Sequence, residues 1–168
     1  MHSPSSIGAW SRAFLLAISL VLAVAGALLA GASAAQAAPP CYHSTCVGKN
    51  PQTLGCGADA TTLDEFTRSG QFRVELRRSA LCGAAWTRIT TFRGAPITAC
   101  DINYAQIRSY TSTDALKDQY WAQSVCNGSG ATTTGGQAYT KMVSFGDYVR
   151  ACITDYKTSP PKACTARH

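Results

Sequence analysis

The sequence predicts a small, disulfide-stapled domain of mainly β structure, an antiparallel barrel or sandwich with one or two short helices. Three observations support this class. Eight cysteines all lie downstream of an N-terminal export signal, and an even number of thiols in a short exported chain is typical of disulfides. Several short segments alternate apolar and polar residues, as half-buried strands do. Turn-forming residues separate these segments, as in small antiparallel folds.

The first 37 residues have the pattern of a secretory signal. A polar start precedes an apolar run over 13–30, and Ala35-Gln36-Ala37 is an A-x-A cleavage site. Removing residues 1–37, which hold one arginine and no acid, leaves 131 residues with 14 basic and 9 acidic side chains, a net charge of +5. The alternative is an uncleaved anchor, because the apolar run approaches the roughly 17–25 residues of a membrane span. We predict cleavage and a secreted protein without a stable membrane anchor.

The remaining chain has the length of one domain. Residues 38–57 are predicted to form a proline-led arm followed by a stapled loop, because Pro39-Pro40 favours extended backbone and glycines punctuate the rest. Residues 58–168 are predicted to form a single mainly-β domain that continues from this loop. Its last part, 156–168, is predicted to be a polar tail that is held by Cys164, stiffened by Pro160-Pro161 and ends in a disordered His168.

The clearest strand covers 71–78, where apolar Phe72, Val74 and Leu76 alternate with charged residues. A second strand over 84–92 completes a predicted hairpin. Further strands are expected over 139–145 and 148–155, separated by the turn dipeptide Gly146-Asp147. The apolar pattern of 96–110 fits a helix or a strand.

Two segments favour helices. In 58–70, Asp59 and two threonines are helix-capping residues ahead of Leu63. In 111–125, Leu116 and Tyr120 share one face at helical spacing. A strand at the end of this second segment is the alternative.

The cysteines set the expected crosslinks. Eight cysteines permit 105 pairings, and we predict that neighbours along the sequence pair. The predicted disulfides are Cys41–Cys46, Cys56–Cys82, Cys100–Cys126 and Cys152–Cys164.

Few residues are suited to catalysis. After cleavage only His43 and His168 remain as imidazoles, and His43 is expected to be an exposed loop residue rather than a catalytic base. No cysteine or histidine spacing typical of zinc ligands is present, so neither metal nor cofactor is expected. Glu75 lies among arginines, and we interpret it as part of a cross-strand ion pair. The alternative is a glycosidase acid, with a partner among Asp101, Asp114 and Asp118.

Arginines on the predicted hairpin alternate with aromatic residues, a combination that can hold single-stranded nucleic acid. We expect these aromatics to lie in the core instead, so no nucleic-acid partner is predicted. A basic face on an exported protein suits anionic polymers of the cell surface.

Cysteines and other residues over 41–88 occur at characteristic spacings: Cys41, Cys46, Gly48, Lys49, Pro51, Cys56, Asp59–Thr62, Glu75–Arg77, Ser79, Cys82, Ala84–Trp86 and Arg88. With these residues the segment resembles a bacterial family of exported, cysteine-rich proteins whose shared domain has no assigned function. Asn50 and Arg78 depart from the family pattern, which has an acid and a tyrosine there. The resemblance implies export and disulfides and no particular reaction. A separate likeness, to small adaptor subunits of exported antibacterial toxin particles, implies a bridging role.

The favoured function is therefore a secreted, non-enzymatic interaction module. It would bind another exported protein or an anionic cell-surface polymer, and the likeness to toxin-particle adaptors implies that it does so within an exported toxin assembly. The alternatives are a small wall-glycan hydrolase with paired carboxylates, and an extracellular stress or coat protein without a specific ligand. The predicted binding residues lie in the stapled loop and on the hairpin: Tyr42, His43, Lys49, Arg73, Arg77 and Arg88.

Overall fold

The computed structural model describes residues 40–96, 104–123, 134–155, 157 and 160–168. The described residues all belong to one compact unit, Ala38–His168. The predicted export signal and the first two residues of the arm lie outside the described residues. Within the described part, no helix has the length and apolar character to cross a membrane.

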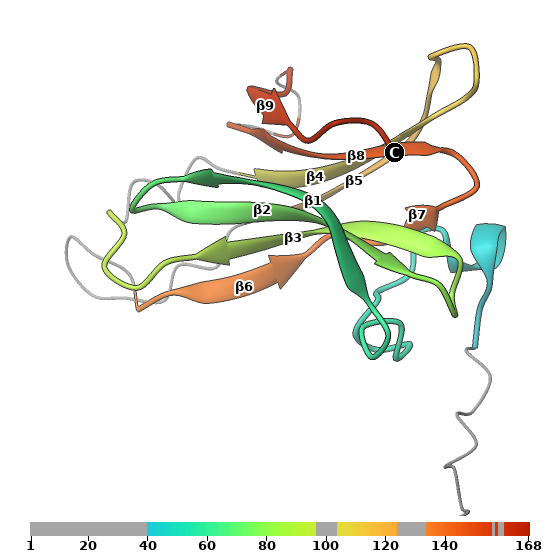
Figure 1. Cartoon of the computed structure of the whole chain (residues 1–168), viewed down its shortest axis with the longest axis horizontal. Helices are drawn as coiled ribbons and strands as arrows, with labels where there is room; N and C mark the ends of the chain where they lie inside the picture. Colours follow the sequence, from blue (N-terminus) through green and yellow to red (C-terminus); the bar gives the residue numbers. More distant parts are fainter. Residues whose placement is uncertain (1–39, 97–103, 124–133, 156, 158–159) are drawn as a thin grey trace, which may run out of the picture. The chain divides into compact units, whose positions relative to one another are not determined.

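The described residues form two antiparallel sheets, which confirms the predicted mainly-β, disulfide-stapled class (Figure 1). The first sheet has the order β1-β2-β3-β6, and β7 also pairs with β3. The second sheet has the order β5-β4-β8-β9. The elements are the 3-10 helix η1 (His43–Cys46) and the strands β1 (Thr61–Arg68), β2 (Phe72–Ser79), β3 (Ala84–Thr91), β4 (Tyr104–Tyr110), β5 (Leu116–Gln123), β6 (Gly136–Tyr139), β7 (Val143–Ser144), β8 (Tyr148–Thr154) and β9 (Ala163–Cys164).

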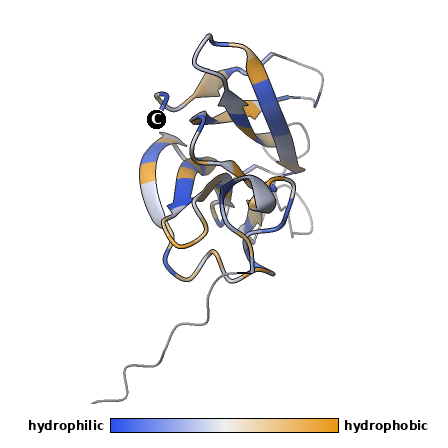
Figure 2. Cartoon of the chain, turned by 90° about the vertical axis from the view of Figure 1, so that its right-hand side faces the viewer, coloured by the Kyte–Doolittle hydropathy of each residue, from blue (hydrophilic) through white to orange (hydrophobic). Residues whose placement is uncertain are grey.

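The core lies between the inner faces of the two sheets. Because side chains alternate across a strand, Phe72, Val74 and Leu76 of β2 point inward while the residues between them point away. Figure 2 shows the resulting bands of hydrophobic and hydrophilic residues along the strands. Burying one such aliphatic or aromatic side chain contributes about 1.5–3 kcal/mol. The buried cluster comprises Phe72, Val74, Leu76, Ala85, Ile89, Ala105, Ile107, Val143, Val149, Ala151 and Ile153.

The predicted hairpin of 71–78 and 84–92 is confirmed as β2 and β3, which pair in continuous register from Phe72↔Thr91 to Ser79↔Ala84. The helix predicted in 58–70 is wrong, since this segment is the strand β1, paired with β2. Of the predicted capping residues, Asp59 lies in the turn before β1, whereas Thr61 and Thr62 belong to β1 itself. Gly70, at φ +68°, lies in the tight connection from Arg68 to Phe72. Partner strands thus override a weak local helix signal.

The helix predicted in 111–125 is also wrong, because Leu116–Gln123 form the strand β5 against β4. Thr111 to Ala115 make the preceding turn, with a hydrogen bond from Thr111 N to Ala115 O of 2.9 Å and Asp114 at φ +65°. Aromatic residues such as Tyr120 and Trp121 favour strands. The undecided segment 96–110 contains the strand β4.

The strand predicted over 139–145 is mostly wrong, because only Tyr139, at the end of β6, and Val143–Ser144, the strand β7, are in strands. Gly146-Asp147 does not close a hairpin. It leads from β7, paired with β3, to β8, paired with β4, so the chain passes from one sheet to the other. Residues near the C-terminus pair with the second sheet. β9 pairs with β8, and His168 N donates to Val149 O at 3.0 Å, so the prediction of a disordered His168 is wrong.

Three of the predicted disulfides are confirmed: Cys41–Cys46, Cys56–Cys82 and Cys152–Cys164. The fourth predicted pair, Cys100–Cys126, lies outside the described residues.

Candidate functional site

The stapled loop is fastened to the first sheet at several points. Cys41–Cys46 spans η1, and Cys56–Cys82 ties the loop to the β2–β3 turn. His43 N donates to Cys82 O at 2.9 Å. Further along, Gly48 N donates to Met142 O and Met142 N to Lys49 O, each at 2.9 Å. A loop with covalent and backbone attachments on both sides has little conformational freedom to lose on binding.

The sulfur atoms of this loop form a second, smaller core. The four Sγ atoms of Cys41, Cys46, Cys56 and Cys82 lie within 4.8 Å of one another and are buried. They pack against Ala84, Trp86 and Met142. Four thiolates at this spacing would suit a zinc ion, but paired sulfurs offer no thiolate. The cluster therefore acts as a crosslinked core that supports the loop.

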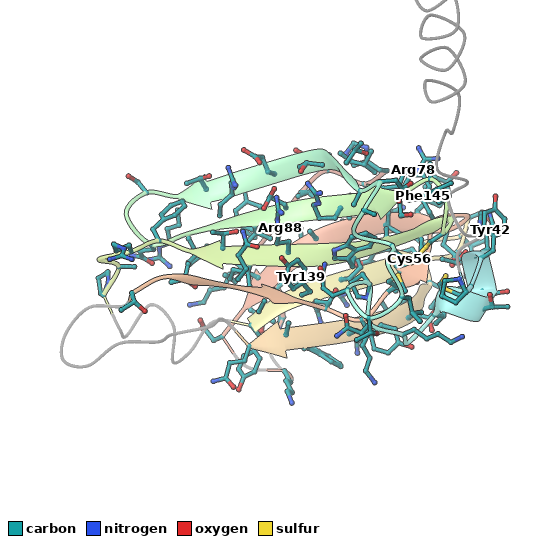
Figure 3. The ribbon with its side chains drawn as sticks, turned by 90° about the horizontal axis from the view of Figure 1, so that it is seen from below. Tyr42, Cys56, Arg78, Arg88, Tyr139 and Phe145 are labelled. Atoms are coloured by element: carbon teal, nitrogen blue, oxygen red, sulfur yellow. A yellow bond between two sulfur atoms is a disulfide. The ribbon has the colours of Figure 1, made fainter. Side chains whose placement is uncertain are left out.

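Tyr42 projects from this support. Its side chain is 57 % exposed, and its ring contacts the His43 ring edge-on with centroids 4.2 Å apart. The His43 ring fills the space beside Gly83, where an added Cβ would lie 2.9 Å from it. His43 is thus half-buried rather than exposed as predicted. Figure 3 shows Tyr42 at the edge of the domain, beside the 3-10 helix.

Leu81 adds an apolar side chain, 41 % exposed, from the neighbouring β2–β3 turn. Asp59 holds that turn, since its carboxylate accepts hydrogen bonds from Leu81 N at 2.9 Å and Ser79 Oγ at 2.5 Å. Burial raises the pKa of Asp59, but these hydrogen bonds outweigh it and the net pKa is lowered.

We call Tyr42, His43, Lys49 and Leu81 the stapled-loop surface. Sequence reasoning missed Leu81, although an apolar residue in a turn beside a cysteine was a visible signal.

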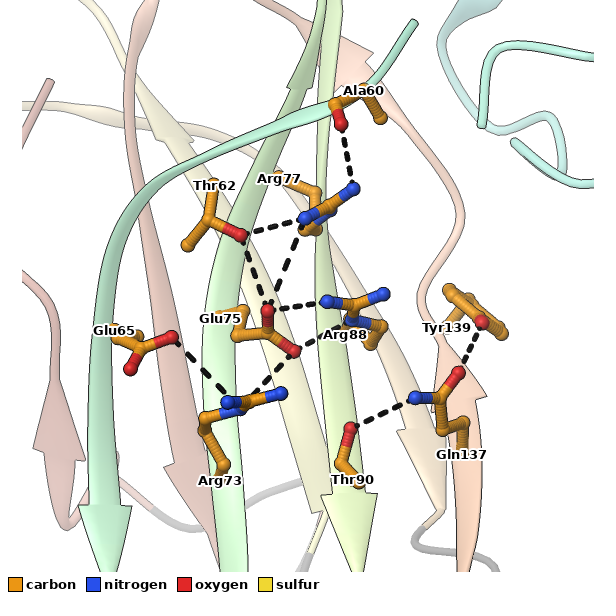
Figure 4. A network of polar contacts seen from close by, with 10 residues as sticks. All are labelled: Ala60, Thr62, Glu65, Arg73, Glu75, Arg77, Arg88, Thr90, Gln137 and Tyr139. Atoms are coloured by element: carbon orange, nitrogen blue, oxygen red, sulfur yellow. Dashed lines mark hydrogen bonds and ion pairs between the residues drawn. The ribbon is translucent and has the colours of Figure 1, made fainter. Parts of the chain in front are cut away.

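The arginines of the hairpin converge on one carboxylate on the outer face of the first sheet (Figure 4). Glu75 is only 2 % exposed. Arg88 binds it with two nitrogens, Nε at 2.6 Å and Nη2 at 2.5 Å. Arg73 and Arg77 lie at 3.6 Å and 3.9 Å, and Thr62 Oγ1 at 3.1 Å. The predicted cross-strand pair is present, with Glu75 opposite Arg88 in the strand register.

This setting keeps Glu75 ionised. Burial raises its pKa, but the hydrogen bond and charge of Arg88, with the charge of Arg73, outweigh burial and lower the net pKa. The hydrogen bond from Arg88 to Glu75 raises the pKa of Arg88 in turn. A glycosidase acid needs a raised pKa, so Glu75 is suited to hold arginines rather than to donate a proton.

The structure thus brings the predicted binding residues together as two groups. The three arginines surround Glu75, and their side chains are 38 %, 15 % and 20 % exposed for Arg73, Arg77 and Arg88. Arg77 also donates to Ala60 O at 2.7 Å, which attaches the residue before β1 to β2. Much of the hairpin's positive charge therefore serves the fold, and Arg73 keeps the most exposure of the three. Tyr42, His43 and Lys49 lie in the loop instead.

These features define a disulfide-crosslinked, two-sheet β domain with a rigid loop surface. The chain belongs to the family described as Protein of unknown function (DUF2690), whose model matches residues 44–152, more than half of the chain. The resemblance to a family without an assigned function is thereby confirmed. No match was found among curated proteins or among solved structures.

Proposed function

We propose that this chain is a secreted, non-enzymatic interaction module that binds another exported protein through the stapled-loop surface. The observation that carries the proposal is Tyr42, an exposed aromatic residue next to a buried, crosslinked cysteine. Tyrosine is enriched among the residues that dominate binding energy at interfaces. A side chain fixed in place before binding loses less entropy in the complex.

Secretion forms part of the proposal because of the crosslinks and the predicted signal. Disulfides persist in oxidising compartments and are rare in reducing ones. The described residues contain three of them within a small β domain. An export signal at 1–37 would deliver the chain to a compartment where they last.

A bridging role, as the likeness to toxin-particle adaptors implies, requires a second surface. The outer face around Arg73 is the candidate, since Arg73 keeps 38 % exposure while it contacts Glu75. An anionic cell-surface polymer or an acidic protein would suit it. A hydrolase is the weaker alternative, because Glu75 is buried and held by two hydrogen bonds from Arg88. Of the candidate partner acids, Asp114 and Asp118 belong to the second sheet and its turn, and Asp101 lies outside the described residues.

Co-purification of the tagged protein from culture medium tests the proposal. We expect a stoichiometric partner with the natural chain and its loss with Tyr42→Ser or Leu81→Ser. Tyr148→Ser is the matched control, because Tyr148 is a 49 % exposed tyrosine on β8, outside the stapled-loop surface. Titration of the identified partner with each purified variant then distinguishes direct binding from indirect co-purification. A natural chain that recovers no stoichiometric partner would contradict the adaptor role and favour a coat protein without ligand.

The contribution of the proline-led arm needs a separate variant. Cys41 must remain because it is crosslinked to Cys46, so the deletion should cover only 38–40. A partner lost from this deletion but bound by Tyr148→Ser would show that the arm adds to the interface, as an extended strand added to a partner's sheet would.

A further inference from the structure

The outer face of the second sheet carries a cleft that lies apart from the stapled-loop surface. Its volume is about 550 Å³, within the roughly 300–1,000 Å³ of small-molecule sites. Four lining residues come from two paired strands, Gln106 and Arg108 from β4, Gln119 and Trp121 from β5. Gln106 lies opposite Trp121 and Arg108 opposite Gln119. These side chains thus form a compact two-by-two array on one face of the sheet.

The array is held by the rest of the sheet. Ala105 and Ile107, which alternate with the lining residues, lie in the core. The row containing Trp121 and Gln106 continues through Cys152 to Cys164, across all four strands of the sheet. The Cys152–Cys164 disulfide closes this row. It also limits movement of the segment that brings Pro160 and Pro161 to the cleft. A preformed cleft binds with a smaller loss of entropy.

Three residues that line the cleft have a buried polar atom that makes no hydrogen bond to the described residues. Gln106 is 2 % exposed, and its Oε1 has no hydrogen-bond partner in the described part of the chain. Arg108 Nε and Trp121 Nε1 are also buried atoms without a hydrogen-bond partner among the described residues. Leaving one buried polar group unpaired costs about 1–3 kcal/mol, and such groups are uncommon in native folds. Three on adjacent residues of one cleft indicate a ligand rich in hydrogen-bonding groups.

The donor set indicates which ligand. Two amides that both donate and accept, a forked guanidinium and an indole N–H match the hydroxyl groups of a sugar. The indole also offers an apolar face, against which the C–H face of a pyranose ring can pack. Gln106 Nε2 donates to Gln119 Oε1 at 3.3 Å, a long contact that a sugar hydroxyl can replace. Arg108 and Lys157 line the cleft, and no carboxylate does so among the described residues.

We propose that this cleft binds an acidic glycan, with Trp121 packed on a pyranose ring, Gln106 and Gln119 on its hydroxyl groups and Arg108 on its acidic group. The site is a binding site and performs no reaction. It is independent of the stapled-loop surface, so the module would hold a glycan on one sheet and an exported protein at the loop.

Calorimetric titration of the protein purified from culture medium tests the proposal with two disaccharides. One joins N-acetylglucosamine to N-acetylmuramic acid and carries a carboxylate; the other, chitobiose, is neutral. We expect the acidic disaccharide to bind at least tenfold more tightly. Trp121→Ala should weaken both by tenfold or more, and Arg108→Gln should remove the preference while keeping the affinity for chitobiose.

Two variants keep the outcome interpretable. Tyr42→Ser should bind both sugars as the natural chain does, so loss of the protein partner and loss of the glycan are separate results. Gln119→Leu, a change at a half-buried strand position, replaces Trp121→Ala if that variant fails to fold. Absence of binding to either disaccharide, or binding that Trp121→Ala and Gln119→Leu both leave intact, would overturn the site. Equal affinity of the natural chain for the two sugars would overturn the acidic class.

Discussion

At the scale of single residues, Glu75 shows how one carboxylate organises a sheet face. It is buried beneath three arginines, and Arg88 holds it with two hydrogen bonds. A buried charge that loses its partner is strongly destabilising. The arginines therefore depend on Glu75 as much as Glu75 depends on them. The sequence predicted this pair because strand alternation placed Glu75 between Arg73 and Arg77, with Arg88 on the partner strand.

We predict that Glu75→Gln lowers the free energy of unfolding by about 2–4 kcal/mol at neutral pH, because it removes the buried carboxylate that Arg88 binds. Urea unfolding measures this change. Glu65→Gln is the matched control, since Glu65 lies opposite Glu75 on β1, is 46 % exposed and makes one 3.9 Å contact. A loss equal to that of Glu65→Gln would contradict the structural role of Glu75.

The same residue predicts a pH dependence. The pKa of Glu75 is lower in the folded chain than its ordinary 4.5. The carboxylate thus contributes stability that is fully present above pH 4.5 and is lost as the pH falls through the lower, folded-state pKa. The difference in unfolding free energy between the natural chain and Glu75→Gln should shrink over that interval. A difference that stays constant from neutral pH to pH 3 would contradict this assignment.

Gly83 controls the base of the stapled-loop surface. Its φ of +56° is strained for other residues, and an added Cβ would lie 2.9 Å from the His43 ring. Gly83→Ala should destabilise the fold by about 1–3 kcal/mol and weaken partner binding, because His43 and Tyr42 must move. Gly70→Ala is the control: its φ is +68° with open space around it, so it reports backbone strain alone. Identical effects of the two variants on binding would show that the His43 contact is unimportant.

At the scale of elements, the predicted strands include both regular and irregular patterns. β2 follows period-two patterning and was predicted. β3 was predicted although Trp86 and Ile89 do not alternate strictly, and most of its residues are buried. β1 and β5 were predicted as helices from capping residues and apolar spacing, which are local signals. Their pairing with β2 and β4 involves residues outside each segment, so these signals did not indicate it. This error also hid the cleft, since Trp121 lies opposite Gln106 only once β5 is a strand. The passage of the chain from one sheet to the other at Gly146-Asp147 depends on the pairing of β7 with β3 and of β8 with β4, which the local sequence does not indicate.

The two stapling disulfides of the loop form an element whose sulfurs are close enough to exchange. In Cys82→Ala, the freed Cys56 lies within 4.8 Å of the sulfurs of Cys41 and Cys46. A thiolate at this position can attack the remaining disulfide, so peptide mapping should find Cys56 joined to Cys41 or Cys46. Cys164→Ala is the control, because the freed Cys152 belongs to no such sulfur cluster in the described part of the chain. Finding only Cys41–Cys46 in Cys82→Ala would contradict this prediction.

At the scale of the whole molecule, small aliphatic side chains and alanines make up much of the core, so crosslinks carry a large share of the stability. Each disulfide typically contributes about 2–4 kcal/mol, and a small domain has about 5–15 kcal/mol in total. Complete reduction should therefore unfold the domain at 37 °C. Near-ultraviolet circular dichroism follows this loss, with alkylated protein to prevent reoxidation. A reduced chain with an unchanged urea midpoint would show that the inter-sheet core suffices, and the stapled loop would then serve only to present Tyr42.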